Sequence, residues 1–263
     1  MNLLEVEGLA KSYPRRRNVL GRVVDRVDAV RDVGFTLGRG ETLSIVGESG
    51  AGKSTVGRLI LRLIEPDRGR ILLDGVDLRA MSREQLRAYR RHMQMIFQDP
   101  FSSLDPRVEI GRSVEEPMLL HFDLPEDERR ARALGLLKRV GLDESYARRL
   151  PSGLSGGQLQ RVAIARALTL NPKIIVCDEP VAALDVSVRA QVLNLMAELQ
   201  EEFGVSYLFI SHDLSIVRAI SDRVAVMSKG SIVEIGETER IFAAPQNSYT
   251  TELIQAIPRM AFA

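Results

Sequence analysis

The segment from Gly47 to Ser54 constrains this chain more than any other part of its sequence. It reads Gly-Glu-Ser-Gly-Ala-Gly-Lys-Ser, which is the spacing of a phosphate-binding loop. Residues 43–46 before it have the pattern of a buried strand, and apolar residues at 56, 59, 60, 63 and 64 after it have helical spacing. A random chain of this length matches the loop pattern about once in a hundred. The sequence therefore predicts a strand, a glycine loop and a helix that ends before Pro66, with backbone N–H groups around a phosphate.

Residues 47–55 are the candidate contacts to a nucleoside triphosphate. Lys53 is expected to reach the β- and γ-phosphates, and the Ser54 hydroxyl to bind Mg²⁺. The other candidates in this stretch are Gly47, Glu48, Ser49, Gly50, Ala51, Gly52 and Thr55.

Length and composition restrict the class of protein. The chain has 263 residues, of which 45% are hydrophobic and 27% charged, as is ordinary for a globular protein. Lys and Arg number 36 and Asp and Glu 35, so a net charge of +1 gives no basic field that favours nucleic acid, and none is expected as a partner. No apolar run approaches the ~20 residues of a membrane-spanning helix, and residues 1–5 lack the pattern of a signal peptide. The single cysteine, Cys177, excludes an internal disulfide, and we expect a protein of the cytosol.

Short apolar runs alternate with helical patterns, which predicts an α/β fold around a mostly parallel sheet. Strands are expected in the first 46 residues, at 174–177 and at 207–210, and helices at 126–140 and 188–203. Ser82 and Gln85 have the spacing of a capping box. We predict a single domain over residues 1–263, with a catalytic core and β lobe at 1–95 and 168–263 and a helical subdomain at about 96–167. The run Arg15–Arg17 predicts an exposed loop.

Two acids follow the apolar run 174–177. Parallel strands of an open α/β sheet bind ligands beyond their carboxyl ends, so Asp178 is expected to hold Mg²⁺ and Glu179 to orient or deprotonate the attacking water. Cys177 lies inside the apolar run and is interpreted as a packed core thiol without chemistry.

A second glycine turn, Leu154–Gln158, precedes another helical pattern. Ser155, Gly156, Gly157 and Gln158 are candidates for a second anion cradle. A helix start capped by Ser155 explains the same residues equally well, and the residues alone leave the two interpretations open.

The run Leu-Ser-Gly-Gly-Gln, between a phosphate loop and an Asp-Glu pair, closely resembles the signature of ATP-binding-cassette (ABC) ATPases. In that family two subunits close head to tail, so each ATP lies between the phosphate loop of one and the signature of the other. The resemblance implies a phosphate-loop core with an antiparallel N-terminal β lobe and an inserted helical subdomain.

Four further residues match the family's markers in order. The resemblance implies that Tyr13 stacks on adenine, that Gln98 binds Mg²⁺ and senses the attacking water, that His212 contacts the γ-phosphate, and that Asp185 links the two sites. Simpler interpretations exist for each: Tyr13 covers an edge strand, Gln98 is a surface amide, His212 is a capping or core histidine, and Asp185 caps a helix.

Three segments, residues 95–107, 185–193 and 247–253, resemble the importers of di- and oligopeptides and of nickel. The resemblance implies an ATP-hydrolysing subunit that works as a homo- or heterodimer beneath two permease subunits, which an extracytoplasmic binding protein supplies with solute. The ATPase subunit would lie peripherally at the cytoplasmic face of the inner membrane. Gln98 and its neighbours would line a groove that receives a short helix of the permease. Ala182 replaces the branch's usual serine, which removes a hydroxyl near the seam of the dimer. Leu159 replaces a frequent arginine, which predicts an altered surface contact only.

Three alternatives compete with a peptide importer. The first is an importer of nickel or another small solute from the same branch, and the second is an accessory ATPase outside transport. The third, a DNA-associated ABC ATPase, needs a long coiled coil between phosphate loop and signature, and residues 55–154 hold no sustained heptads.

Overall fold

A computed structural model describes residues 2–17 and 23–256 of the chain. Its contacts divide the chain into two compact units. One unit comprises the residues up to Met81 together with those from Leu208 onward, and the other comprises Ser82–Tyr207.

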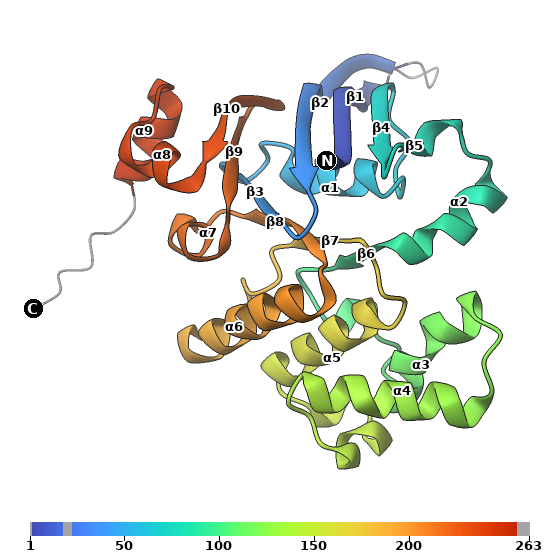
Figure 1. Cartoon of the computed structure of the whole chain (residues 1–263). Coiled ribbons are helices and arrows are strands. Elements are labelled where there is room, and N and C mark those ends of the chain that lie inside the picture. The colour runs from blue at the N-terminus through green and yellow to red at the C-terminus, as the bar shows by residue number, and fades with distance from the viewer. Residues whose placement is uncertain (1, 18–22, 257–263) are drawn as a thin grey trace, which may run out of the picture. The chain divides into compact units, whose positions relative to one another are not determined.

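The first unit contains an antiparallel sheet with the strand order β2-β1-β4-β5 (Figure 1). The strands and helices of this part of the chain are β1 (Asn2–Arg17), β2 (Val23–Gly38), β3 (Thr42–Val46), α1 (Lys53–Ile60), β4 (Arg68–Leu73), β5 (Val76–Asp77), α7 (Leu214–Ile220), β9 (Arg223–Ser228), β10 (Ser231–Glu237), α8 (Thr238–Ala243) and α9 (Ser248–Gln255), with a 3₁₀ turn at Leu78–Ala80.

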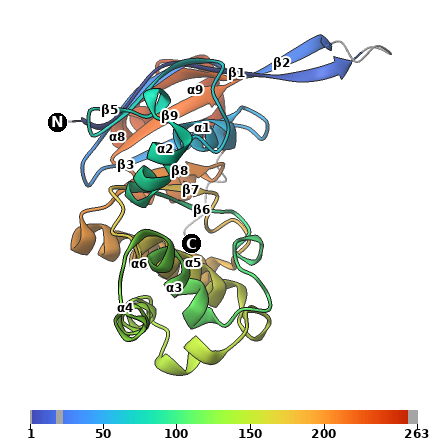
Figure 2. The same ribbon diagram turned by 90° about the vertical axis from the view of Figure 1, so that its right-hand side faces the viewer.

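The loop predicted at Arg15–Arg17 is wrong, because β1 continues through these residues as one arm of a hairpin with β2. Figure 2 shows the hairpin extending beyond the other strands of its sheet. Pro14 pairs with Arg26, and the Arg15 guanidinium lies 3.9 Å from the Asp25 carboxylate on the opposite strand. Arg15 is exposed on this strand, so a run of charged residues is compatible with a strand as well as with a loop.

A second sheet contains six strands in the order β10-β9-β3-β8-β7-β6, where β8 is Ser206–Ser211, β7 is Ile174–Asp178 and β6 is Met93–Ile96. β3 runs parallel to β9 and β6 runs parallel to β7. Every residue of β3, β7 and β8 is buried, as expected for strands covered on both faces. The mixed α/β class predicted from the sequence is confirmed.

Helix α1 is shorter than predicted, because it ends at Ile60 instead of just before Pro66. Arg62 has a φ of +46°, and its guanidinium donates to the carbonyl oxygens of Leu78 at 2.6 Å and Met81 at 3.1 Å. The chain leaves the helix through local backbone bonds, the Leu63 N–H to the Arg58 carbonyl and the Arg62 N–H to the Leu59 carbonyl, both at 2.9 Å, and the Arg62 side-chain contacts add to them.

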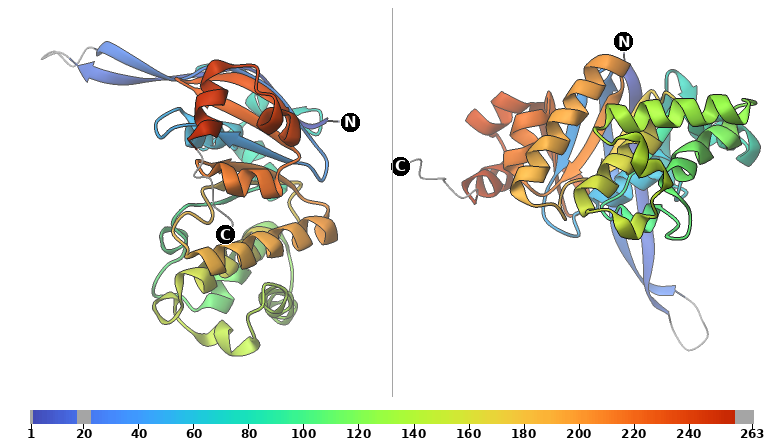
Figure 3. Two further views of the ribbon diagram at one scale, coloured as in Figure 1. Left: turned by 90° about the vertical axis from the view of Figure 1, so that its left-hand side faces the viewer. Right: turned by 90° about the horizontal axis from the view of Figure 1, so that it is seen from below.

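The second unit is mostly helical between its strands. Its helices are α2 (Arg83–Tyr89), α3 (Ile110–His121), α4 (Glu126–Arg139), α5 (Gly156–Leu168) and α6 (Val186–Phe203), with 3₁₀ turns at Arg90–His92, Phe101–Ser103, Glu144–Arg148 and Pro151–Gly153. Helices α3, α4 and α5 pack against one another, green to yellow in Figure 3. The capping box of Ser82 and Gln85 is confirmed at the start of α2. Leu159, expected at the surface, is fully buried, because α5 is covered on most of its sides.

Candidate nucleotide site

The phosphate loop connects β3 to α1 in the first unit, and two of its glycines have no room for a side chain. Gly47 has a φ of +149° and Gly52 a φ of +105°. A Cβ on Gly47 would lie closer than 3.0 Å to the Met227 carbonyl oxygen, and a Cβ on Gly52 would lie equally close to the Ala29 carbonyl oxygen. Only glycine combines these backbone angles with so close an approach, which explains the motif in structural terms.

The loop encloses the amino group of Lys53. The Lys53 side chain is 5% exposed, and its Nζ donates to the carbonyl oxygens of Gly47 at 2.8 Å and Glu48 at 2.9 Å. Helix α1 begins without a side-chain cap and has no acid in its first turn. Its first N–H groups and the Lys53 charge therefore suit an anion, and Ser54 and Thr55 lie in that first turn.

Tyr249 is a contact to the loop that the sequence analysis missed. Its hydroxyl accepts a hydrogen bond from the Glu48 N–H at 3.2 Å. The residue lies in segment 247–253, which the sequence analysis used only to choose a branch of the family. Nothing in the sequence pairs it with a loop about two hundred positions away.

His212 and Tyr13 belong to the same unit as the phosphate loop. His212 is exposed directly after β8, and Asp213 caps α7 by accepting from the Ser215 N–H at 3.0 Å, so the core and capping alternatives for His212 are wrong. Tyr13 lies in the extended part of β1 opposite Val27, with Lys11 Nζ 5.8 Å from its ring centroid. The contacts of Tyr13 and His212 with nucleotide stay predictions.

In the second unit the structure brings Gln98 and Glu179 together. The Gln98 Nε2 donates to a Glu179 carboxylate oxygen at 3.1 Å, although the two residues are 81 positions apart. Gln98 is exposed as the surface-amide alternative requires, and it is also bonded to the predicted base. Glu179 has a φ of +50°, a conformation that non-glycine residues rarely adopt and that turns the chain sharply after β7.

Asp178 ends β7 and is 5% exposed. Cys177, one residue earlier, is fully buried, which confirms the core thiol. Burial, and secondarily the nearby Asp178 carboxylate, raises the pKa of the Cys177 thiol well above its ordinary value, so it stays protonated at neutral pH.

The glycine turn of the second unit is a capped helix start. The Gln158 N–H donates to Ser155 Oγ at 3.4 Å, and the Ser155 N–H donates to the Gln158 side chain at 2.9 Å. A Cβ on Gly157 would lie closer than 3.0 Å to the Val188 side chain. The capping interpretation is confirmed, and the exposed Ser155 also leaves the turn accessible to a ligand or another chain.

Asp185 caps α6, as its simpler interpretation states. Its carboxylate accepts from the Val188 N–H at 2.9 Å and the Ser187 hydroxyl at 2.8 Å. These bonds, the Val188 N–H first, lower the pKa of the Asp185 carboxyl. The link between two sites stays a prediction.

Among residues 2–17 and 23–256, no cluster of three or more His, Cys, Asp or Glu side chains suits a metal ion. Mg²⁺ needs no such cluster, because it is held by one or two protein oxygens together with substrate phosphates and water. The hydroxyl of Ser54 and the buried carboxylate of Asp178 are oxygen donors of this kind. None of the helices in the described ranges is both long and apolar enough to cross a membrane.

Comparison with known proteins identifies the class. The family model of the ABC transporter matches residues 30–182, and the chain belongs to this family. Within it, the chain is 52% identical over 256 residues to the glutathione import ATP-binding protein GsiA of Pectobacterium atrosepticum, and 52% identical over the same length to that of Escherichia coli K12. The match covers 97% of this chain and 41% of each relative, so the chain spans less than half their length.

Solved structures have the same fold. The structure of cbiO1 from Clostridium perfringens, described as part of the ABC transporter complex cbiONQ, has a TM-score of 0.80 and 31% identity, covering 98% of this chain and 96% of that one. A dimeric post-hydrolysis structure of the ATP-binding cassette MJ0796, bound to ADP and Pi, has a TM-score of 0.79 and 32% identity, covering 89% of this chain and 98% of that one. The fold predicted from the resemblance, that of an ABC ATPase, is confirmed.

Proposed function

We propose that this chain is the ATP-binding and ATP-hydrolysing subunit of a bacterial ABC importer that takes up di- or oligopeptides. The single observation that carries the ATPase proposal is the phosphate loop, whose Gly47 and Gly52 leave no room for a Cβ and whose Lys53 is buried within it. The similarity to glutathione import proteins supports a peptide-type solute, since glutathione is itself a small peptide.

In this proposal the loop binds the triphosphate. The N–H groups at the start of α1 and the Lys53 ammonium neutralise phosphate charge, after Lys53 exchanges its bonds to the loop carbonyls for bonds to phosphate. Tyr13 stacks on the adenine ring and His212 contacts the γ-phosphate. Ser54, Asp178 and Gln98 would hold Mg²⁺, whose positive charge would offset the charge that develops on the β- and γ-phosphates.

Glu179 acts on the attacking water. Its carboxylate accepts a proton from that water as the new bond from the water oxygen to the γ-phosphorus forms. The bond between the γ-phosphorus and the β–γ bridging oxygen breaks, the bridging oxygen leaves with ADP, and inorganic phosphate is released. Gln98 already donates to this carboxylate, so the pair fixes both the base and an amide that orients the water.

Two subunits complete each site. In a closed dimer, the signature turn of one subunit presents Ser155, Gly156 and Gly157 to the triphosphate on the loop of the other. Asp185 links the two sites at the seam. The dimeric, nucleotide-bound MJ0796 cassette supports this proposal. The partner subunit is either a second copy or a related ATPase, and the single domain proposed for residues 1–263 is the unit that pairs.

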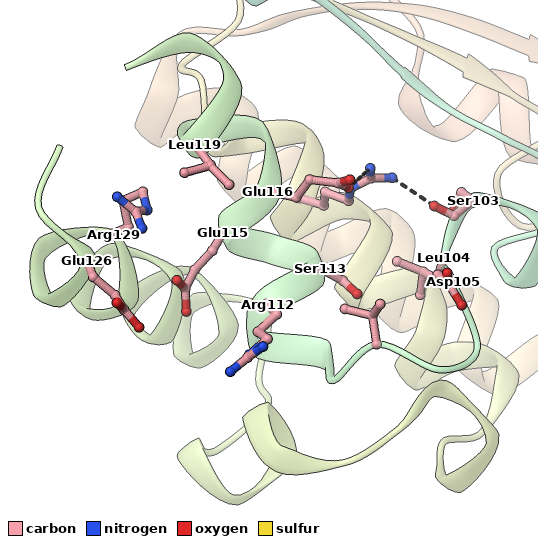
Figure 4. Close-up of a pocket in the computed structure, with 12 residues that line it drawn as sticks. Ser103, Leu104, Asp105, Arg112, Ser113, Glu115, Glu116, Leu119, Glu126 and Arg129 are labelled. Atoms are coloured by element: carbon pink, nitrogen blue, oxygen red, sulfur yellow. Dashed lines mark hydrogen bonds and ion pairs between the residues drawn. The ribbon is translucent and has the colours of Figure 1, made fainter. Parts of the chain in front are cut away.

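The remaining partners are two permease subunits and an extracytoplasmic binding protein, with the ATPase peripheral to the cytoplasmic face of the inner membrane. A pocket of about 430 Å³ in the second unit lies beside the segment that follows Gln98 (Figure 4). Leu119, one of the residues that line this pocket, is an exposed apolar residue. We propose that the permease helix binds in this pocket.

Substitution of Glu179 by Gln tests the ATPase proposal. The amide keeps the shape of the side chain but accepts no proton, so ATP binding is retained, turnover falls by a factor of about 10² to 10⁴, and ATP holds the dimer closed. Phosphate release, nucleotide affinity and elution volume in gel filtration measure the three effects. Glu198→Gln, at an exposed position on α6, is the matched control. Phosphate release at the wild-type rate by Glu179→Gln contradicts the assigned role.

Co-purification tests the transport proposal. A permease pair recovered with the chain from membranes supports import, whereas a soluble enzyme complex supports the accessory alternative. Uptake of labelled dipeptide against labelled nickel then separates the two importer assignments.

A further inference from the structure

Arg166 joins three segments of the second unit through one guanidinium group. It lies on α5, the helix that begins with the signature turn. Its Nη1 donates to the Ser103 carbonyl oxygen at 2.8 Å, and its Nη2 donates to the Glu116 carboxylate on α3 at 2.6 Å (Figure 4). The planar guanidinium reaches both acceptors at once, and a carboxylate partner makes the stronger bond of the two.

Ser103 is the last residue of the short turn that follows Gln98. Bonds within this turn tie its residues together: the Phe101 N–H donates to Asp99 Oδ1 at 3.0 Å, the Ser102 hydroxyl to the Asp99 carbonyl at 2.7 Å, and the Ser103 hydroxyl to the Pro100 carbonyl at 2.8 Å. Phe101 is 53% exposed, so its burial does not fix the turn. The bond from Arg166 to the Ser103 carbonyl oxygen therefore restrains the whole turn back to Asp99, which is the neighbour of Gln98.

Gln98 in turn donates to Glu179 at 3.1 Å. The contacts thus run without a break from Arg166, through the turn 99–103, to the amide and the acid to which the proposed function assigns catalysis. Leu104, which is buried, is a second anchor of the same turn.

We propose that Arg166 is a positioning residue, which holds the turn 99–103 and thereby keeps Gln98 against Glu179. The catalytic roles of Gln98 and Glu179 in this proposal rest on the proposed function. The contact by which Arg166 holds the turn rests on the geometry alone. Arg166 touches no substrate; it acts through Ser103 and Glu116. Ser103, Glu116 and Arg166 also line the pocket, so an occupant of the pocket contacts Arg166 and both of its hydrogen-bond partners.

The test compares Arg166→Gln with wild type in the full chain, by two independent measurements. Amide hydrogen exchange at Phe101, Ser103 and Leu104, whose N–H groups are all bonded within the turn, is expected to rise by about tenfold. The kcat for ATP is expected to fall by about tenfold while the dissociation constant for ATP changes less than about twofold, because the phosphate loop itself is unaltered. Arg166→Lys is expected to recover part of the kcat that Arg166→Gln loses, because the lysine ammonium can still donate but cannot reach both acceptors as the planar guanidinium does.

Arg132→Gln is the matched control, because Arg132 forms an ion pair with Glu128 at the same distance, 2.6 Å, on α4 and contacts no part of the turn. Glu116→Gln is the second variant: it weakens the bond between Arg166 and Glu116 at an exposed side chain, and it keeps the proposal testable if Arg166→Gln does not fold. Its exchange and kcat effects are expected in the same direction and to be smaller.

Unchanged exchange in the turn, or an equal kcat loss in Arg132→Gln, overturns the positioning role. A loss of kcat accompanied by an equal loss of ATP affinity also overturns it, because it indicates general damage. A failure of the proposed function is separate: the wild type then hydrolyses no ATP, while the exchange measurement still reports whether Arg166 holds the turn.

Discussion

Glu179 occupies a backbone conformation that costs about 1–3 kcal/mol for a residue with a side chain. Glu179 follows a fully buried strand, and its carboxylate accepts a hydrogen bond from the Gln98 amide. The backbone strain therefore lies at a residue to which the proposed function assigns chemistry. Lys53 is a similar case, a buried ammonium held by two carbonyl oxygens of the loop that it serves.

The phosphate loop gives a direct test of close packing at single residues. In Gly52→Ala the new methyl group meets the Ala29 carbonyl oxygen at a positive φ, and we expect a loss of about 3 kcal/mol of unfolding free energy. Gly40→Ala, at a φ of +64° with no atom within 4 Å, is the control and is expected to cost about 1 kcal/mol. Urea unfolding measures both, and equal losses would show that backbone angle alone explains the glycine.

Helix starts are where local sequence and proposed function coincide. The residues that cap the starts of α2, α5 and α6 are Ser82, Ser155 and Asp185, and each has a side chain that accepts a hydrogen bond from a backbone N–H. A cap satisfies one of the N–H groups that a helix leaves unpaired and does not consume the others. Ser155 and Asp185 can therefore cap a helix within one subunit and still face a ligand or a second subunit.

The cap of α6 predicts a pH dependence. The Val188 N–H and the Ser187 hydroxyl lower the pKa of Asp185 in the folded protein, so its charge stabilises the fold above the unfolded pKa of about 3.9 and this contribution is lost as the pH falls through the lower folded value. Asp185→Asn keeps the acceptor oxygen and removes the charge. We expect the difference in Tm between wild type and Asp185→Asn to be largest near pH 6 and to vanish toward pH 2.

The control for that titration is Asp123→Asn, which removes an exposed carboxylate outside any helix. A Tm difference for Asp185→Asn that persists unchanged to pH 2 would mean that the carboxyl group does not stabilise the helix through its charge.

The shared-site proposal, in which each ATP site combines residues of two chains, is tested in mixed dimers. We expect a dimer that carries Lys53→Ala and Ser155→Arg on the same chain, with a wild-type partner, to lose activity at both sites. With the two substitutions on opposite chains, both fall on one site, and about half of the activity remains. Differently tagged chains, purified as mixed dimers, allow phosphate release to be compared between the two arrangements.

The reverse pattern, with half activity for the same-chain arrangement and none for the opposite one, shows that each chain uses its own signature turn. Thermal unfolding of each single variant checks that the substituted chains fold.

Much of this protein is fixed by patterns within a few residues of one another. The glycine loop with its strand and helix, the acids at the end of β7, and the cap at Ser82 depend on local backbone angles and local hydrogen bonds, so the sequence shows them. The cap at Ser155 is one of two interpretations that the sequence left open, and the structure decided it. Only the tertiary structure shows the contacts between segments that are distant in the sequence, because the local patterns do not record them. Arg62, just past the end of α1, donates to carbonyl oxygens near residue 80. Strand β2 pairs with Arg16 and Arg17 in β1, and Tyr249 contacts the phosphate loop from the other end of the chain. Gln98 against Glu179 and Arg166 against Ser103 are of the same kind, because a hydrogen bond between residues more than sixty positions apart leaves no periodicity in either segment.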